Sequence, residues 1–133
     1  QPIMLRLESD LVELCLKACD GKLDEVKSQW NPKASLGIVL AAEGYPGDYR
    51  KGNEITGLSQ SAVENEKVFL AGVAEQEGKL VTNGGRVLCV TALGESVFEA
   101  QQKALKLAEQ IQWSGCFYRR DIGYRAVERE HAK

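Results

Sequence analysis

The strongest constraint on the fold is a change of hydrophobic period at Ser96. Before it, residues 86–94 form an almost continuous apolar run, which is typical of a buried β-strand. After it, apolar side chains recur three and four residues apart, with charged and amide side chains between them. This pattern predicts an amphipathic helix over residues 96–112 that lies across a sheet. Its apolar positions are Val97, Ala100, Ala104, Leu107, Ala108 and Ile111.

Shorter apolar runs predict the remaining strands of that sheet. We expect strands at residues 34–42, 67–73, 79–83 and 116–118, a candidate edge strand at 53–58, and a turn with a last strand at 119–127. Residues 43–52 are rich in Gly and Pro and form a loop, and Asn83-Gly84 is a hairpin signal. The sequence therefore predicts an α+β fold: a small, mostly antiparallel sheet with one long amphipathic helix.

A second helix is predicted at residues 9–20, before the sheet. Ser9 is the expected N-cap and Gly21 the expected stop signal. Apolar residues cover most of the circumference of this helix, so it needs neighbours on several sides. Residues 23–33 are polar around Trp30, which places a domain boundary there. We expect residues 27–133 to form the domain and residues 1–26 to precede it as a helical tail.

Composition excludes several classes of function. The 133 residues are 44% hydrophobic and 27% charged, with a net charge of −2, so no broad field attracts nucleic acid or an anionic membrane. No apolar run is long enough to span a bilayer. The four cysteines lack Cys-x-x-Cys spacing and there is one His, which favours reduced, mostly buried thiols over a metal site. We find no catalytic motif, and the start at Gln1 leads us to expect a piece of a longer protein.

Three segments are candidate binding sites. In Thr82-Asn83-Gly84-Gly85-Arg86, two glycines allow backbone amides to face an anion, and Arg86 can bind a phosphate with two donors; the alternative is a plain hairpin turn. Residues 119–125 contain three arginines, which would form either a phosphate pocket or a cluster of ion pairs. The loop at residues 44–52 either presents its tyrosines to a ligand or packs them as a small satellite core.

Five segments in a fixed order resemble the C-terminal third of the glycinamide ribonucleotide synthetase family, the bacterial phosphoribosylamine–glycine ligases. The resemblance extends over nearly the whole chain. The segments are QPIMLRL (residues 1–7), SDLVEL (9–14), GYPGDY (44–49), TNGGRVLCVTALG (82–94) and RRDIGYRA (119–126).

The resemblance implies an ATP-grasp ligase of de novo purine biosynthesis. Such a ligase joins phosphoribosylamine to glycine and converts ATP to ADP and phosphate through a glycyl phosphate. It implies that ATP and Mg²⁺ (or Mn²⁺) bind to ATP-grasp domains N-terminal to Gln1, and that this fragment binds neither and is inactive alone. Residues 1–26 would be the tail of the ATP-grasp core and residues 27–133 the C-terminal domain, in a cytoplasmic protein.

The resemblance also implies the role of the basic residues. Arg86, with Asn83, Gly84 and Gly85, is the first candidate for binding the ribose phosphate of phosphoribosylamine, and Arg119 is the second. No residue of this chain is expected to be catalytic or to bind a metal. Two alternatives remain open: a stand-alone regulatory module that binds a phosphorylated metabolite, and a purely structural interaction domain. A full reading frame with an upstream ATP-grasp region would decide among the three.

Overall fold

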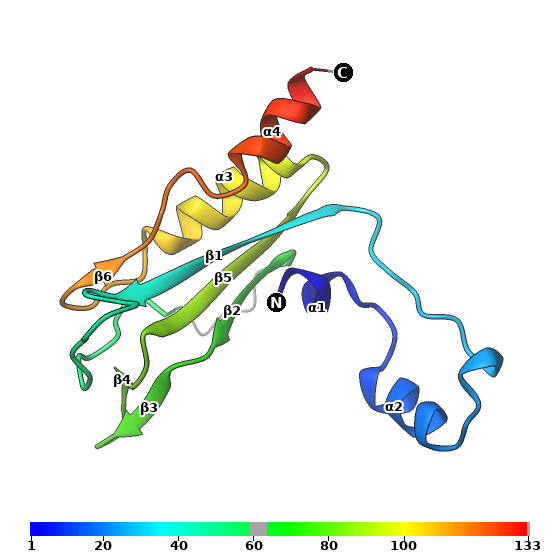
Figure 1. The fold of residues 1–133 in the computed structure, drawn as a ribbon, viewed down its shortest axis with the longest axis horizontal. Coiled ribbons are helices and arrows are strands. Elements are labelled where there is room, and N and C mark those ends of the chain that lie inside the picture. The colour runs from blue at the N-terminus through cyan, green and yellow to red at the C-terminus, as the bar shows by residue number, and fades with distance from the viewer. Residues whose placement is uncertain (59–63, 133) are drawn as a thin grey trace.

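The fold is built on a four-stranded antiparallel sheet, seen in a computed structural model that describes residues 1–58 and 64–132 (Figure 1). The strand order is β2-β5-β1-β6, and a separate two-stranded sheet pairs β3 with β4. This confirms the predicted α+β class and its mostly antiparallel sheet. The strands are β1 (Ala34–Ala42), β2 (Glu66–Leu70), β3 (Val73–Gln76), β4 (Lys79–Thr82), β5 (Arg86–Gly94) and β6 (Cys116–Phe117).

The amphipathic helix α3 (Val97–Ala108) covers one face of the four-stranded sheet, as predicted (Figure 1). The Ser96 hydroxyl caps it by accepting from the Glu99 amide at 3.1 Å. The apolar face of α3 packs on Ile38 and Leu40 of β1 and on their neighbours in β5. The helix ends before the predicted residue 112, because Gln112 exchanges two backbone hydrogen bonds with Thr56, at 2.9 and 3.0 Å.

One strand prediction and one hairpin prediction in the middle of the chain are wrong. Residues 53–58 form no strand and make only isolated bridges, from Glu54 to Val81 and from Thr56 to Gln112. The turn at residues 83–85 is not a hairpin, because β4 pairs with β3 while β5 pairs with β1 and β2. The chain crosses between the sheets where Gly72 and Gly84 touch, and a Cβ built on Gly72 would lie 2.7 Å from the Gly84 Cα.

The last predicted strand is also wrong, since Tyr124–His131 form the helix α4. Its C-terminal half reaches the start of α3, where the Glu130 carboxylate accepts from the Val97 and Phe98 amides at 2.7 and 3.1 Å. These are two of the free amides that begin any helix. At its other end, the Ile122 carbonyl accepts from the Gln101 side chain at 2.7 Å. Long-range contacts therefore fix α4, which a local pattern does not reveal.

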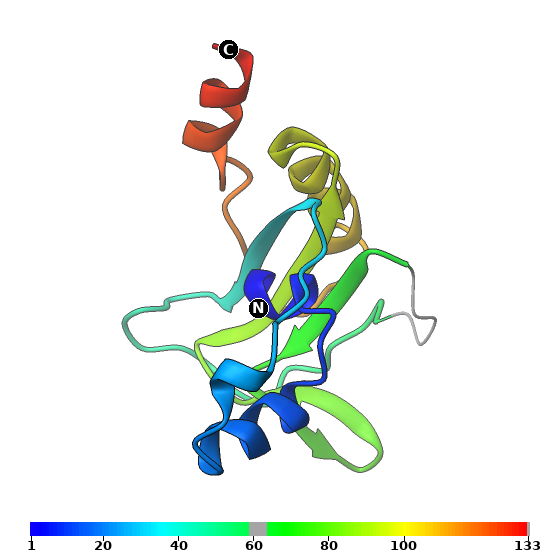
Figure 2. The same ribbon diagram turned by 90° about the vertical axis from the view of Figure 1, so that its right-hand side faces the viewer.

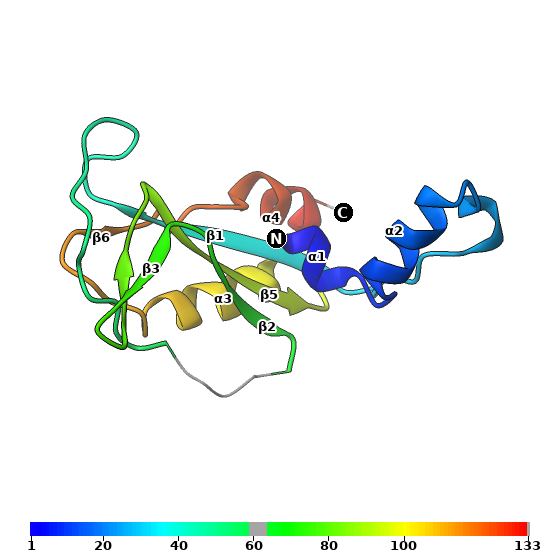
Figure 3. The same cartoon turned by 90° about the horizontal axis from the view of Figure 1, so that it is seen from below.

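The N-terminal residues form a short helix on the sheet and a projecting arm. The short helix α1 (Pro2–Arg6) lies on the sheet face opposite α3, and a Cβ on Gly37 would meet the Pro2 ring at 3.0 Å. Next, Leu7 pairs with Trp30, and two backbone hydrogen bonds of 2.7 and 3.0 Å flank this pair. Residues 8–29, which we call the arm, begin and end next to the Leu7–Trp30 pair and extend away from α3 (Figure 2 and Figure 3).

The arm contains the predicted first helix, α2 (Leu11–Cys19), and a 3-10 turn, η1 (Leu23–Glu25). Its cap is Asp10 instead of Ser9, because the Asp10 carboxylate accepts from two first-turn amides, whereas the Ser9 hydroxyl accepts from the Gln29 amide at 2.7 Å. Gly21 ends the helix at φ +69°, as predicted. No residue of α2 is buried, and all of its apolar residues except the half-buried Leu14 are exposed.

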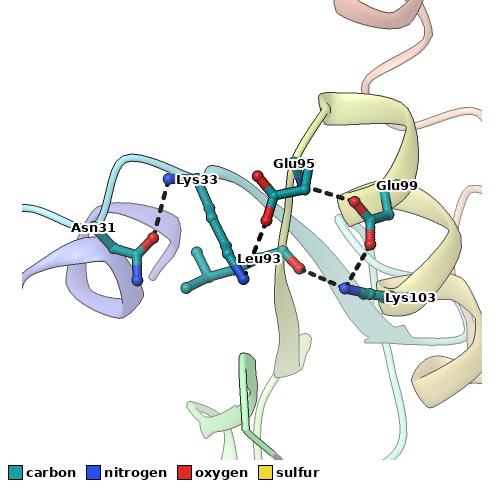
Figure 4. A network of polar contacts seen from close by, with 6 residues as sticks. All are labelled: Asn31, Lys33, Leu93, Glu95, Glu99 and Lys103. Carbon is teal, nitrogen blue, oxygen red and sulfur yellow. Dashed lines mark hydrogen bonds and ion pairs between the residues drawn. The ribbon is translucent and has the colours of Figure 1, made fainter.

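A polar network joins residues 31–33, which connect the arm to β1, to the start of α3 (Figure 4). Lys33 forms an ion pair with Glu95 at 3.2 Å, and the Glu95 amide donates to Glu99 at 2.7 Å. Glu99 in turn pairs with Lys103 at 2.8 Å, and this contact lowers the pKa of Glu99. Within the described residues, no helix has both the length and the apolar character needed to cross a bilayer.

Candidate functional site

An open pocket of about 480 Å³ lies on the sheet face opposite α3, at the start of β5. Val39 and Cys89, which are register partners in β1 and β5, form part of its floor. Tyr45 and Tyr49 border it from the loop that follows β1, and Arg86 lines it from β5. The other lining residues are Gln1, Ala71, Gly72, Gly85 and Leu88.

A β-bulge places Arg86 in this pocket. Leu88 pairs with Leu40 and Arg86 pairs with Ala41, so Val87 between them has no partner in β1. Strict alternation from Leu88 would put Arg86 under α3 in the core. The extra residue instead keeps Val87 fully buried and leaves Arg86 exposed. The predicted cation is therefore available to a ligand.

Arg86 dominates the electrostatics of the pocket. It is the one charged side chain among the residues that line the pocket, and no ion pair joins it to any other residue that the structure describes. A neighbouring pocket of about 470 Å³, on the other side of the same loop, has Glu43 and Asp48 in its lining beside Arg50. An anion is thus favoured on the Arg86 side and disfavoured next to the two carboxylates.

The structure does not bring Arg119 into the Arg86 pocket. Its guanidinium binds Asp121 with two donors, at 3.0 and 2.6 Å. This contact lowers the pKa of the Asp121 carboxyl and raises the pKa of Arg119. Arg120 similarly pairs with Glu109 at 2.6 Å. The sequence predicts either a phosphate pocket or a cluster of ion pairs at residues 119–125, and in the structure Arg119 and Arg120 form ion pairs.

The predicted turn residues divide into two groups. Gly85 and Arg86 line the pocket, whereas Gly84 packs on Gly72. Asn83 is exposed, and its backbone amide donates to the Gly72 carbonyl at 2.7 Å. The sequence predictions do not connect the loop at residues 43–52 to this turn. The available signal was the pair of tyrosines in GYPGDY beside a turn with two glycines.

The cysteines show no sign of a reactive or metal-binding site. All four are free; Cys15 and Cys19 are exposed on the arm, which corrects the expectation that the thiols are mostly buried. Burial raises the pKa of the Cys116 thiol to about 11, opposite to the shift that activates a nucleophile. In the described part of the chain, no three His, Cys, Asp or Glu side chains are grouped to hold a metal ion.

Comparison with known proteins gives consistent matches. The family model for the phosphoribosylglycinamide synthetase C domain matches residues 35–125. The curated phosphoribosylamine–glycine ligase of Haemophilus influenzae is 90% identical over 100% of this chain, and that of Pasteurella multocida is 79% identical over 98%. A crystal structure of phosphoribosylamine–glycine ligase from Thermotoga maritima superposes with a TM-score of 0.67 and 44% identity over 83% of this chain and 26% of that one. The chain spans about 31% of the length of the Haemophilus relative and 30% of the Pasteurella one.

Proposed function

Because the chain belongs to the phosphoribosylglycinamide synthetase C-domain family, we propose that it is the C-terminal part of a phosphoribosylamine–glycine ligase. The whole enzyme would form glycinamide ribonucleotide from phosphoribosylamine, glycine and ATP in de novo purine biosynthesis. A cytoplasmic location agrees with the four free cysteines. The observation that carries the proposal is the family match together with 90% identity to a ligase over the whole chain.

Within that enzyme, we propose that this domain binds the ribose phosphate of phosphoribosylamine through Arg86. An exposed guanidinium without a carboxylate partner can offer two parallel donors to a phosphate. Gly85 adjoins it in the pocket lining, and Gly84 and Asn83 precede Gly85 in the turn. Arg119 is the second candidate, and it would first have to release Asp121.

The nucleotide and the metal ion are assigned to the rest of the enzyme. A ligase of this kind needs preorganised charges for a triphosphate and Mg²⁺ (or Mn²⁺). Among the residues that the structure describes, no three His, Cys, Asp or Glu side chains are grouped to hold a metal ion. The proposed partners of this domain are the N-terminal ATP-grasp domains of the same chain and the two small substrates.

The arm supports a division of the chain near residue 26. Leu11, Val12 and Leu16 are 46, 67 and 62% exposed, although their helical spacing is that of a packed face. The family match starts only at residue 35, beyond the arm. We propose that residues 1–26 are the tail of the ATP-grasp core, in which α2 packs against that core and α1 lies on the sheet of the C-terminal domain, residues 27–133.

A domain exchange tests the proposed function. In the Haemophilus ligase, the matching 133 residues are replaced by this chain, and we call the product the full-length ligase. We expect it to have the activity of the parent within about threefold, because the two segments are 90% identical and most single substitutions have modest effects. A version truncated before this chain should be inactive. A folded full-length ligase without activity would contradict the proposal and favour the regulatory or structural alternatives.

A further inference from the structure

The two tyrosines of the loop pack directly on the turn that precedes Arg86. A Cβ built on Gly85 would lie 2.2 Å from Tyr45 Cδ2 and 3.0 Å from Tyr49 Cε1, so any side chain there would have to displace the Tyr45 ring. The two rings also pack edge to face, with centroids 6.4 Å apart and an interplanar angle of 61°. Gly85 has no positive φ, so the rings and not the backbone conformation require a glycine at this position.

Hydrogen bonds fasten both ends of the same loop to the residues around the turn. Where the loop leaves β1, the Ala42 amide donates to the Gly85 carbonyl at 2.8 Å. Where it returns, the Gly52 amide donates to the Thr82 carbonyl at 2.7 Å, and the Asn53 amide donates to the Thr82 hydroxyl at 3.1 Å. Thr82, which accepts the two bonds at the returning end, is only 1% exposed. The loop and the turn therefore form one unit.

This unit fixes the peptide from which the Arg86 side chain extends. An exposed arginine has many rotamers, and only a rigid base limits the positions that its guanidinium can reach. Tyr45, Tyr49, Gly85 and Arg86 all line the same pocket. We infer that Tyr45 and Tyr49 are positioning residues, which hold the Gly85–Arg86 segment so that Arg86 meets the phosphate in a fixed geometry. The inference rests on the proposed function of Arg86.

The test measures the Michaelis constants of the full-length ligase for phosphoribosylamine, ATP and glycine. Tyr45→Ala and Gly85→Ala should each raise the constant for phosphoribosylamine about tenfold or more, because small misplacements of a binding group have large effects. The constants for ATP and glycine should change little. Tyr45→Phe keeps the ring and should recover most of the loss. The matched control is Phe98→Ala, which removes a similarly exposed aromatic side chain on α3, outside both candidate phosphate sites.

Two further variants separate the inference from the function on which it rests. Because Gly85→Ala acts by displacing the ring, Tyr45→Ala combined with Gly85→Ala should be no worse than Tyr45→Ala alone. If Arg86→Ala raises the constant for phosphoribosylamine but Tyr45→Ala and Gly85→Ala do not, positioning is wrong and the proposed function stands. If Tyr45→Phe is as impaired as Tyr45→Ala, the hydroxyl acts on the substrate directly and positioning is wrong. If Arg86→Ala has no effect, the proposed function fails and the inference fails with it.

Discussion

At the scale of single residues, Glu130 is expected to stabilise the junction of two helices. Its carboxylate accepts from two amides that begin α3, while Ser96 accepts from a third. Glu130→Ala should lower the free energy of unfolding by about 0.5–2 kcal/mol, the usual cost of losing a helix cap. Urea denaturation of the chain measures this. Glu128→Ala, an exposed glutamate on the same helix, is the control and should stay within about 0.5 kcal/mol. Equal stabilities of the two variants would contradict the assignment.

The Cys116 thiol gives a second prediction at this scale. Burial raises its pKa from the ordinary 9.0 to about 11, so the folded state holds the proton more tightly than the unfolded state. The resulting stabilisation is complete below pH 9.0 and is lost as the pH rises toward about 11. Between about pH 8 and about pH 10.5, the free energy of unfolding should therefore fall less for Cys116→Ser than for the parent chain. An equal or larger fall in the Ser variant would show that the thiol is not shifted.

At the scale of secondary structure, the arm is expected to be the least stable element. Isolated helices of this length are marginal in water, and α2 buries no residue. An ion pair of 3.0 Å between Lys17 and Glu25 joins α2 to η1, and exposed pairs stabilise little. Amide hydrogen exchange of the isolated chain should therefore be fast for residues 11–19 and slow for β5 and α3. Protection of α2 equal to that of α3 in a proven monomer would contradict this expectation.

Elements could be predicted where their pattern is local. Strand β1 occupies the predicted residues 34–42, and α3 follows the apolar spacing after Ser96. The errors occur where distant contacts decide. Gln112 bonds to Thr56 instead of extending α3, and Glu130 reaches a helix start more than 30 residues away. A hydrophobic pattern over a few neighbouring residues cannot reveal partners that lie so far away in the sequence.

At the scale of the whole molecule, the site could be predicted only in part. The turn with two glycines and Arg86 indicated an anion site, and the structure places Gly85 and Arg86 in one pocket. The bulge at Val87, the contact of Tyr45 with Gly85 and the ion pair of Arg119 with Asp121 depend on tertiary packing. Pattern alone therefore left Arg86 and Arg119 in competition, and their different surroundings now favour Arg86.

The isolated chain gives a prediction at this scale as well. The ATP and Mg²⁺ sites are proposed for the ATP-grasp domains, and the 90% identical relative is about three times as long as this chain. We therefore expect calorimetry with ATP and Mg²⁺ to detect no binding to the chain at micromolar concentrations, while the full-length ligase binds. Micromolar binding of ATP to the isolated chain would place a nucleotide site in this domain and contradict the proposed division of roles.

The Michaelis constant of Arg86→Ala for phosphoribosylamine tests the central claim most directly. In the full-length ligase, this change removes a charge-assisted contact worth about 1.5–3 kcal/mol, which corresponds to an increase of about 10- to 150-fold. The constants for ATP and glycine should change less, and Arg86→Lys should recover part of the loss, because an ammonium lacks the paired donors. An unchanged constant for Arg86→Ala would contradict the account, and an increase for Arg119→Ala in the same assay would transfer the phosphate site to that residue.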